Sequence, residues 1–160
     1  MAERNFQYMD MAKMFFGGDH PLFKAFGIRV DESREGLAAM TMPCVAEMCD
    51  QRGALHRGAI TTLLDSNCGL AILAYLGDMR PIATIDLRVD FLAKPEAGEG
   101  VRGEVECYEV KGDVAYVRGV ALGCSNDSVL ASVSGCFAVG THGPSFDGAV
   151  REKAVREKVS

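Results

Sequence analysis

The sequence predicts an α+β domain in which an antiparallel sheet wraps around one long helix. Residues 57–76 place apolar and small side chains at three- and four-residue spacing, which is typical of a buried helix. Residues 27–43 and 82–139 instead show the alternation and the turn residues of strands. The helix would be about 30 Å long, and a ten-residue strand about 33 Å. Each strand can therefore cover the helix along its whole length.

The composition is that of one ordinary globular domain. The chain has 160 residues, of which 48% are hydrophobic and 24% charged, enough for one sizeable core. Its net charge of -5 argues against a general nucleic-acid binder, which would carry a basic face. The three histidines match no zinc-ligand spacing, so no metal is expected. The six cysteines form no Cys-x-x-Cys pair and are expected to be reduced: Cys44, Cys49, Cys68, Cys107, Cys124 and Cys136.

Neither a membrane span nor a signal peptide is expected. The longest apolar run, Leu70 to Leu76, is far shorter than the ~20 residues that a membrane-spanning helix needs. Residues 1–6 carry charges of both signs, and no apolar block follows them. We therefore expect a cytoplasmic protein without a membrane partner.

The segment before the sheet, residues 1–26, is predicted to be helical. Apolar residues recur at roughly helical spacing over residues 5–16, and two glycines follow that would end the helix. A second, short helix would start with Asp19 as its N-cap and Pro21 in its first turn. Packing on the body of the domain is the expected role of this segment, and a lid over a pocket is the alternative.

The domain proper is placed at residues 27–140. A hairpin of residues 27–33 and 36–43 turns near Arg34–Glu35. Residues 45–49 form a short turn or helical segment before the long helix, which Gly77 ends. Four strands follow, at residues 82–93, 101–110, 114–124 and 128–139. Residues 141–160 form a polar tail, either helical or disordered.

The first of these four strands alternates between apolar and polar residues. One face is expected to carry Ile85, Leu87, Val89 and Phe91, and the other face Thr84, Asp86, Arg88 and Asp90.

One carboxylate on the long helix requires an explanation. Asp65 lies two turns into the helix, and ionising it in an apolar setting would be costly. Either a nearby hydroxyl or backbone group satisfies it, or it is a general base or nucleophile. The Arg57 and Gly58 amides at the helix N-terminus favour negative charge and would stabilise a developing oxyanion. The neighbours of Asp65 on the helix are all small: Thr61, Thr62, Cys68 and Gly69.

Over roughly residues 27–140 these motifs resemble the hotdog-fold acyl-CoA thioesterases of the PaaI type. The family pattern is Asn-x-x-Gly-x-x-His-Gly-Gly, then an Asp or Glu two turns into the helix, then a strand Thr/Ser-x-Asp-x-x-Val-x-Tyr/Phe-Leu. This sequence has Asp50-x-x-Gly53-x-x-His56-Arg57-Gly58, then Asp65, then Thr84-x-Asp86-x-x-Val89-x-Phe91-Leu92. It departs from the pattern twice, because Asp50 replaces the Asn and Arg57 replaces the first Gly of the Gly pair.

The resemblance implies a hotdog fold and hydrolysis of an acyl-CoA thioester to a free acid and coenzyme A. Asp65 would activate water, and the Arg57 and Gly58 amides would bind the oxyanion. Coenzyme A enters as part of the substrate, and no other cofactor is implied. The family forms homodimers whose sheets join edge to edge, and often homotetramers (dimers of dimers), with the active site at the dimer interface.

The resemblance also suggests roles for other residues. At the position of Asp50 the family's Asn polarises the carbonyl or places water. An ionised Asp accepts hydrogen bonds only, so this role would need a protonated Asp50 or a shift of Gln51. Thr84 matches the hydroxyl that orients the attacking water, and is otherwise an ordinary strand residue. His56 is expected to hydrogen-bond the loop. The candidate contacts for coenzyme A phosphates are Lys94, which is preferred, and Arg88, Arg102 and Arg118.

Two other functions stay open. A hotdog dehydratase or hydratase would need a His paired with a carboxylate for proton transfer at carbon, and the helix holds no His beyond His56. A non-catalytic acyl-CoA binding module is the stronger alternative, because Asp50 and Arg57 depart from the family pattern. The sequence does not determine the acyl group, since Leu, Met and Phe suit medium-chain and aromatic acids equally.

Overall fold

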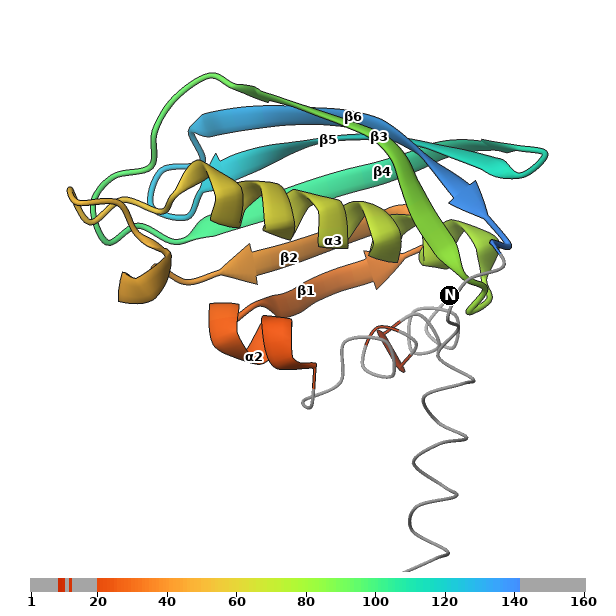
Figure 1. Cartoon of the computed structure of the whole chain (residues 1–160), viewed down its shortest axis with the longest axis horizontal. Helices are drawn as coiled ribbons and strands as arrows, with labels where there is room; N and C mark the ends of the chain where they lie inside the picture. The colour runs from red at the N-terminus through yellow and green to blue at the C-terminus, as the bar shows by residue number, and fades with distance from the viewer. Residues whose placement is uncertain (1–8, 11, 13–19, 142–160) are drawn as a thin grey trace, which may run out of the picture.

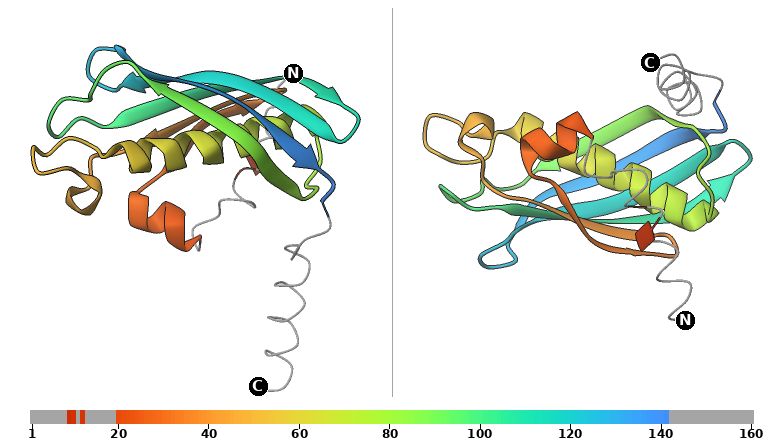
Figure 2. Two further views of the ribbon diagram at one scale, coloured as in Figure 1. Left: turned by 45° about the horizontal axis from the view of Figure 1, so that its top comes forward. Right: turned by 90° about the horizontal axis from the view of Figure 1, so that it is seen from below.

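The computed structural model describes residues 9–10, 12 and 20–141, and it has the α+β architecture that the sequence predicts. Six strands form one antiparallel sheet in the order β1-β2-β4-β5-β6-β3. The long helix α3 (Arg57–Leu76) lies against one face of this sheet (Figure 1). In the view from below, no strand of the described residues covers the side of α3 that faces away from the sheet (Figure 2). This is the arrangement expected from the hotdog resemblance.

The strands lie within two residues of their predicted bounds. They are β1 (Arg29–Arg34), β2 (Leu37–Met42), β3 (Ile82–Phe91), β4 (Val101–Lys111), β5 (Val114–Gly123) and β6 (Val129–Val139). The predicted hairpin is confirmed as β1 and β2, and its turn contains Gly36 at a φ of 70°. The expected short helical segment before α3 is the 3₁₀ helix η1 (Ala46–Met48).

Helix α3 begins and ends where the sequence predicts. Twelve of its 20 residues are buried, and eight of them join inward-facing side chains of β2, β4, β5 and β6 in the hydrophobic core. Gly77 ends the helix in the left-handed region at a φ of 68°, where its amide bonds to the Leu73 carbonyl. Glycine has no Cβ to oppose this conformation. Burial of α3 therefore comes from the sheet wrapped around it.

By length and composition alone, α3 could also cross a membrane. However, 67% of its most apolar window is buried inside the structure. The core helix of a soluble domain passes the same test, so its apolar surface is explained by packing on the sheet.

The predicted unbroken alternation of β3 is wrong at Ile85. Thr84 pairs with Phe137 and Asp86 pairs with Cys136, so Ile85 is the extra residue of a β-bulge. Directly paired residues share a face of the sheet, and Phe137 belongs to the core at 2% exposure. The bulge therefore turns Thr84 toward α3, and Ile85, expected among the apolar face residues, is 58% exposed.

In the N-terminal segment the described residues 9, 10 and 12 are helical, as predicted for residues 5–16. A second, short helix, α2 (Pro21–Phe26), lies beside β1 (Figure 1). Its N-cap is His20, not Asp19 as the sequence suggested, and Pro21 occupies its first position. Phe23 anchors it in the core at 6% exposure. Most of the helix expected over residues 5–16 lies outside the described residues, and so does the tail after residue 141.

Candidate active site at the start and middle of helix α3

One backbone amide in the first turn of α3 lacks a hydrogen-bond partner among the described residues. His56 is the N-cap, and its ring Nδ1 accepts a hydrogen bond from the Gly58 amide at 3.0 Å. The Ala59 and Ile60 amides bond to the His56 carbonyl. Within the described residues the Arg57 amide has no hydrogen-bond partner. A helix N-terminus attracts negative charge through such amides, so Arg57 rather than Gly58 presents the available donor.

The loop before α3 is held by the Asp50 carboxylate. Its Oδ1 accepts hydrogen bonds from the Arg52 amide at 2.8 Å and the Ala54 amide at 3.2 Å. These two bonds, with a smaller contribution from the charge of Lys94, lower the pKa of Asp50 below its ordinary value. Asp50 is therefore ionised at neutral pH and cannot donate a hydrogen bond to a carbonyl. In this structure the Asp50 carboxylate stabilises the conformation of the loop through these two hydrogen bonds.

A cavity of about 400 Å³ opens beside this loop and the first turn of α3, a size that suits a small ligand. Two of the predicted site cations, Arg57 and Lys94, line it together with Asp50 and His56. The Arg57 guanidinium lies 5.0 Å from the ring centre of Phe91, within the range of a cation–π contact. The remaining wall is apolar: Ala54, Leu55, Ile60, Phe91, Ala93 and Pro95.

The middle of α3 carries the second group of candidate residues. Thr84 Oγ1 donates a hydrogen bond to Asp65 Oδ1 at 3.0 Å, and the bulge at Ile85 makes this possible by turning Thr84 toward the helix. Asp65 is half-buried. Its second oxygen, Oδ2, has no partner among the described residues and can accept a proton. The predicted pair is thus brought together, with Thr84 bound to the carboxylate itself.

Within one chain the two groups lie apart on the same helix. Arg57 and Asp65 are eight residues apart, which corresponds to about 12 Å along the helix axis, and Asp65 does not line the cavity. A carbonyl carbon attacked by water at Asp65 must also place its oxygen about 3 Å from an oxyanion donor. One chain therefore contains both kinds of group without combining them in one site.

The other predicted cation, Arg88, does not reach the cavity. It forms an ion pair with Asp90 at 2.9 Å, with 71% of its side chain exposed. Arg88 pairs with Ser134 and not with a core residue. Arg102 and Arg118 are likewise engaged with acidic neighbours, Glu104 and Glu106. Among the described residues, Lys94 is thus the one of the four candidate phosphate contacts that lines the cavity, beside Arg57.

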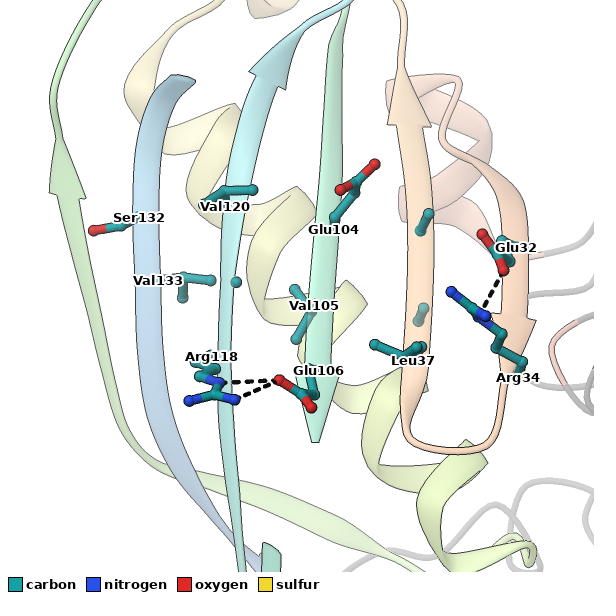
Figure 3. A pocket seen from close by; sticks show the side chains of 13 residues that line it. Glu32, Arg34, Leu37, Glu104, Val105, Glu106, Arg118, Val120, Ser132 and Val133 are labelled. Carbon is teal, nitrogen blue, oxygen red and sulfur yellow. Dashed lines mark hydrogen bonds and ion pairs between the residues drawn. The ribbon is translucent and has the colours of Figure 1, made fainter. Parts of the chain in front are cut away.

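A second cavity, of about 580 Å³, lies on the opposite face of the sheet from α3. Its lining includes two ion pairs, Glu32 with Arg34 and Glu106 with Arg118, and the helix lies behind the strands (Figure 3). None of the candidate catalytic residues contributes to it. Within the described residues, no group of three His, Cys, Asp or Glu side chains is placed to hold a metal ion.

Residues 52–121 match the family model of the thioesterase superfamily. This segment begins two residues after Asp50 and includes the helix, the bulged strand and Lys94. This match covers 70 of the 160 residues, and over that part the chain is similar to the thioesterase superfamily.

Similar proteins agree with that match. The Escherichia coli PaaI protein of the phenylacetic acid degradation operon has a TM-score of 0.76 at 18% identity, covering 85% of this chain and 95% of that one. An asparagine-to-aspartate mutant of PaaI from Thermus thermophilus has a TM-score of 0.66 at 22% identity, covering 74% and 97%. Both likenesses show the shared hotdog fold. PA0474 of Pseudomonas aeruginosa, provisionally named an esterase, is 26% identical over 129 residues, 75% of this chain and 93% of its own.

The match to the superfamily and the esterase-named relative support thioesterase activity as the general class of function for this protein. Sequence reasoning had already found its Asp65, Thr84, Arg57 and Lys94. It had not found the apolar wall of Ile60, Phe91 and Pro95, because burial around a cavity depends on how strands and loop pack. The Asp50-x-x-Gly-Ala segment did contain a signal for the loop, since Asp commonly bonds backbone amides two residues ahead.

Proposed function

We propose that this protein hydrolyses an acyl-CoA thioester to a free acid and coenzyme A, in a site shared by two protomers. The observation that carries the proposal is the Thr84–Asp65 hydrogen bond on a helix whose first amide is unpartnered among the described residues. A held carboxylate and a separate oxyanion donor are the two groups that acyl transfer to water requires.

In the proposed reaction water is the nucleophile. Thr84 fixes one oxygen of the Asp65 carboxylate, so Oδ2 is aimed to take a proton from water as the water oxygen attacks the thioester carbon. The Arg57 amide binds the oxyanion that forms on the carbonyl oxygen. The carbon–sulfur bond then breaks, and the proton held by Asp65 passes to the coenzyme A sulfur. No resident metal or redox cofactor is needed for these steps.

The cavity supplies the substrate contacts. Its apolar wall suits part of the thioester chain, and the cationic groups of Arg57 and Lys94 suit coenzyme A phosphates. Arg88 is not assigned this role, because it lies beside Asp90 away from the cavity.

The shared site follows from the shape of strand β3. This strand is at one edge of the sheet, so one row of its backbone groups is open to another strand. Thr84 lies near its start beside Asp65, and Phe91 lies at its end beside Arg57. In one protomer seven residues, or about 24 Å, separate them along the strand.

Pairing two β3 strands antiparallel across a two-fold axis near residues 87–88 would set Thr84 of one protomer opposite Phe91 of its partner. Asp65 would then face the first turn of the partner helix. The exposed apolar side chains of Ile85 and Leu92, at 58% and 65% exposure, would also be partly covered there. A homodimer is thus the smallest assembly we propose, and a dimer of such dimers is compatible with it.

The test is release of coenzyme A thiol from a panel of short, medium-chain and aromatic acyl-CoA substrates. We expect Asp65→Asn to lower turnover by about 10²–10⁴-fold, the usual contribution of a general base. Asp86→Asn is the matched control, because it removes an exposed carboxylate from the same strand region. Equal turnover by Asp65→Asn and wild type would reject the assigned base.

A non-catalytic acyl-CoA binding module is the second candidate. The ionised Asp50 favours it, because this carboxylate cannot polarise a carbonyl as an amide side chain could. Calorimetric binding of coenzyme A without thiol release from any substrate in the panel would select this alternative.

A further inference from the structure

Two cysteine thiols face one another at the base of the cavity loop. The Sγ atoms of Cys44 and Cys49 are 2.8 Å apart, only about 0.8 Å more than the length of an S–S bond. Both cysteines are free and partly exposed. The backbone holds them in place, since Cys44 comes two residues after β2 and Cys49 forms an isolated β-bridge with Leu55.

We propose that Cys44 and Cys49 form a redox modification site, which a small-molecule disulfide such as glutathione disulfide oxidises to an intramolecular disulfide. The sequence reasoning treated all six cysteines alike, as reduced residues. The structure separates this pair from the others, because Cys68 and Cys107 are buried and no other two sulfurs in the described residues are in hydrogen-bonding contact.

The pair divides the chemistry between an attacking and a resolving thiol. The hydrogen bond to Cys44, followed by desolvation, raises the pKa of Cys49 to about 11. Cys49 therefore keeps its proton at neutral pH, while either sulfur of the pair can donate to the other. The Cys44 thiolate attacks one sulfur of glutathione disulfide, forms a mixed disulfide and releases one glutathione thiolate.

The second step closes the protein disulfide. Once Cys44 is in the mixed disulfide it no longer places a negative charge beside Cys49, so Cys49 loses its proton to solvent and attacks Cys44 Sγ. The bond between Cys44 and glutathione breaks, and a second glutathione thiolate leaves and takes up a proton. In sum, two cysteine thiols lose two electrons and two protons, and glutathione disulfide becomes two glutathione thiols.

The disulfide would act on the loop that lines the cavity. Cys49 directly precedes Asp50, whose carboxylate holds the Arg52 and Ala54 amides. The His56 amide bonds to the Met48 carbonyl just before Cys49. A covalent link at Cys49 therefore restricts both ends of the loop, and we expect slower hydrogen exchange at Arg52 and Ala54 in the oxidised protein.

Peptide mapping of the full chain tests the site. Trypsin cleaves after Arg34 and Arg52, so both cysteines fall on one peptide, residues 35–52. After equilibration in glutathione disulfide and alkylation of free thiols, most of this peptide should have lost two hydrogen atoms and gained no alkyl group. Dithiothreitol should restore two alkylated cysteines.

Variants check the order of steps without requiring thioesterase activity. Cys49→Ser should accumulate a mixed disulfide of glutathione with Cys44, and Cys124→Ser, which removes an exposed cysteine, should behave as wild type. Full alkylation of both cysteines in wild type after oxidation, or pairing of either with another cysteine, would overturn the proposal. The wild-type measurement decides the matter even if a variant fails to fold.

Discussion

The two parts of the candidate site are held in place by different kinds of contact. At the first turn of α3, the hydrogen bonds of His56 and Asp50 join residues two to four positions apart. At the middle of α3, the Thr84–Asp65 bond joins residues 19 positions apart and depends on a bulge in an edge strand. The oxyanion part is therefore built locally, whereas the base part requires the correct register between β3 and the sheet.

The two parts also differ in whether they need a second protomer. The local part is complete in one chain, with its donor at Arg57 and its cavity beside it. The carboxylate about two helical turns away needs a partner protomer to meet that donor. Changes at the first turn should therefore be severe only when they remove the amide itself, and changes at Asp65 should be rescued by a partner that keeps it.

At the first turn of α3 the largest effect is expected from Arg57→Pro, which removes the amide and keeps the helix. Proline is favoured at the first helical position, and His56, with a ψ of 143°, has the extended conformation required before proline. Loss of one oxyanion donor should lower kcat by about 10²–10³-fold.

The matched variant Arg57→Ala keeps the amide and loses only the guanidinium at Phe91. Its kcat should fall far less, with the larger change in KM. Similar kcat losses in the two variants, measured by thiol release at saturating acyl-CoA, would show that the side chain and not the amide matters.

Mixed dimers test whether the two parts come from different chains. Each of the variants Arg57→Pro and Asp65→Asn should be nearly inactive alone. Co-expressed at equal levels, they form mixed dimers with one intact site out of two, so about a quarter of wild-type activity should return if the C2 dimer is correct. Separate affinity tags on the two chains allow the mixed dimer to be purified and assayed. Activity no higher than the sum of the single variants would place both groups in the same protomer or in no common site.

A smaller effect is expected from Thr84→Val, which keeps the shape of the side chain and removes its hydroxyl. One hydrogen bond contributes about 0.5–1.5 kcal/mol, so kcat should fall by roughly twofold to tenfold. Thr62→Val is the control, because the Thr62 hydroxyl bonds only to the Gly58 carbonyl of its own helix. If both substitutions change kcat equally, the hydroxyl at Thr84 has no special part in placing Asp65.

The smallest effect is expected from Asp50→Asn, as a pH-dependent change in the free energy of unfolding. The pKa of Asp50 is lower in the folded protein than its ordinary value of 3.8, so the carboxylate stabilises the fold above that value. This contribution is lost as the pH falls through the folded pKa. The difference in unfolding free energy between wild type and Asp50→Asn should therefore shrink in acid.

Urea unfolding from about pH 6 to about pH 2 measures this difference across the range in which Asp50 titrates. A constant difference between the two proteins across that range would mean that the Arg52 and Ala54 amides do not depend on the Asp50 charge.

Most of the fold could be predicted from the sequence because its signals are local. The apolar stripe and Gly77 located α3 at both ends, and alternation located the four later strands within two residues. The same reasoning found Asp65 and Thr84 but not their geometry. Strict alternation placed Thr84 on the face opposite Leu87, whereas the bulge at Ile85 puts it on the helix side. Residues 83–91 alternate through Ile85 without interruption, so the sequence pattern contains no signal for the bulge.

The sequence by itself therefore determined a buried helix with a carboxylate two turns from its start and the strands that enclose it, because periodicity and capping act over a few residues. Only the tertiary structure decided which groups are available. It showed the Gly58 amide bound to His56, Asp50 committed to its loop, Arg88 kept away from the cavity and Thr84 bonded to Asp65. The Thr84–Asp65 bond joins distant segments and is set by packing and strand register. The other three contacts are local in sequence, but the residue pattern does not specify which atoms they engage.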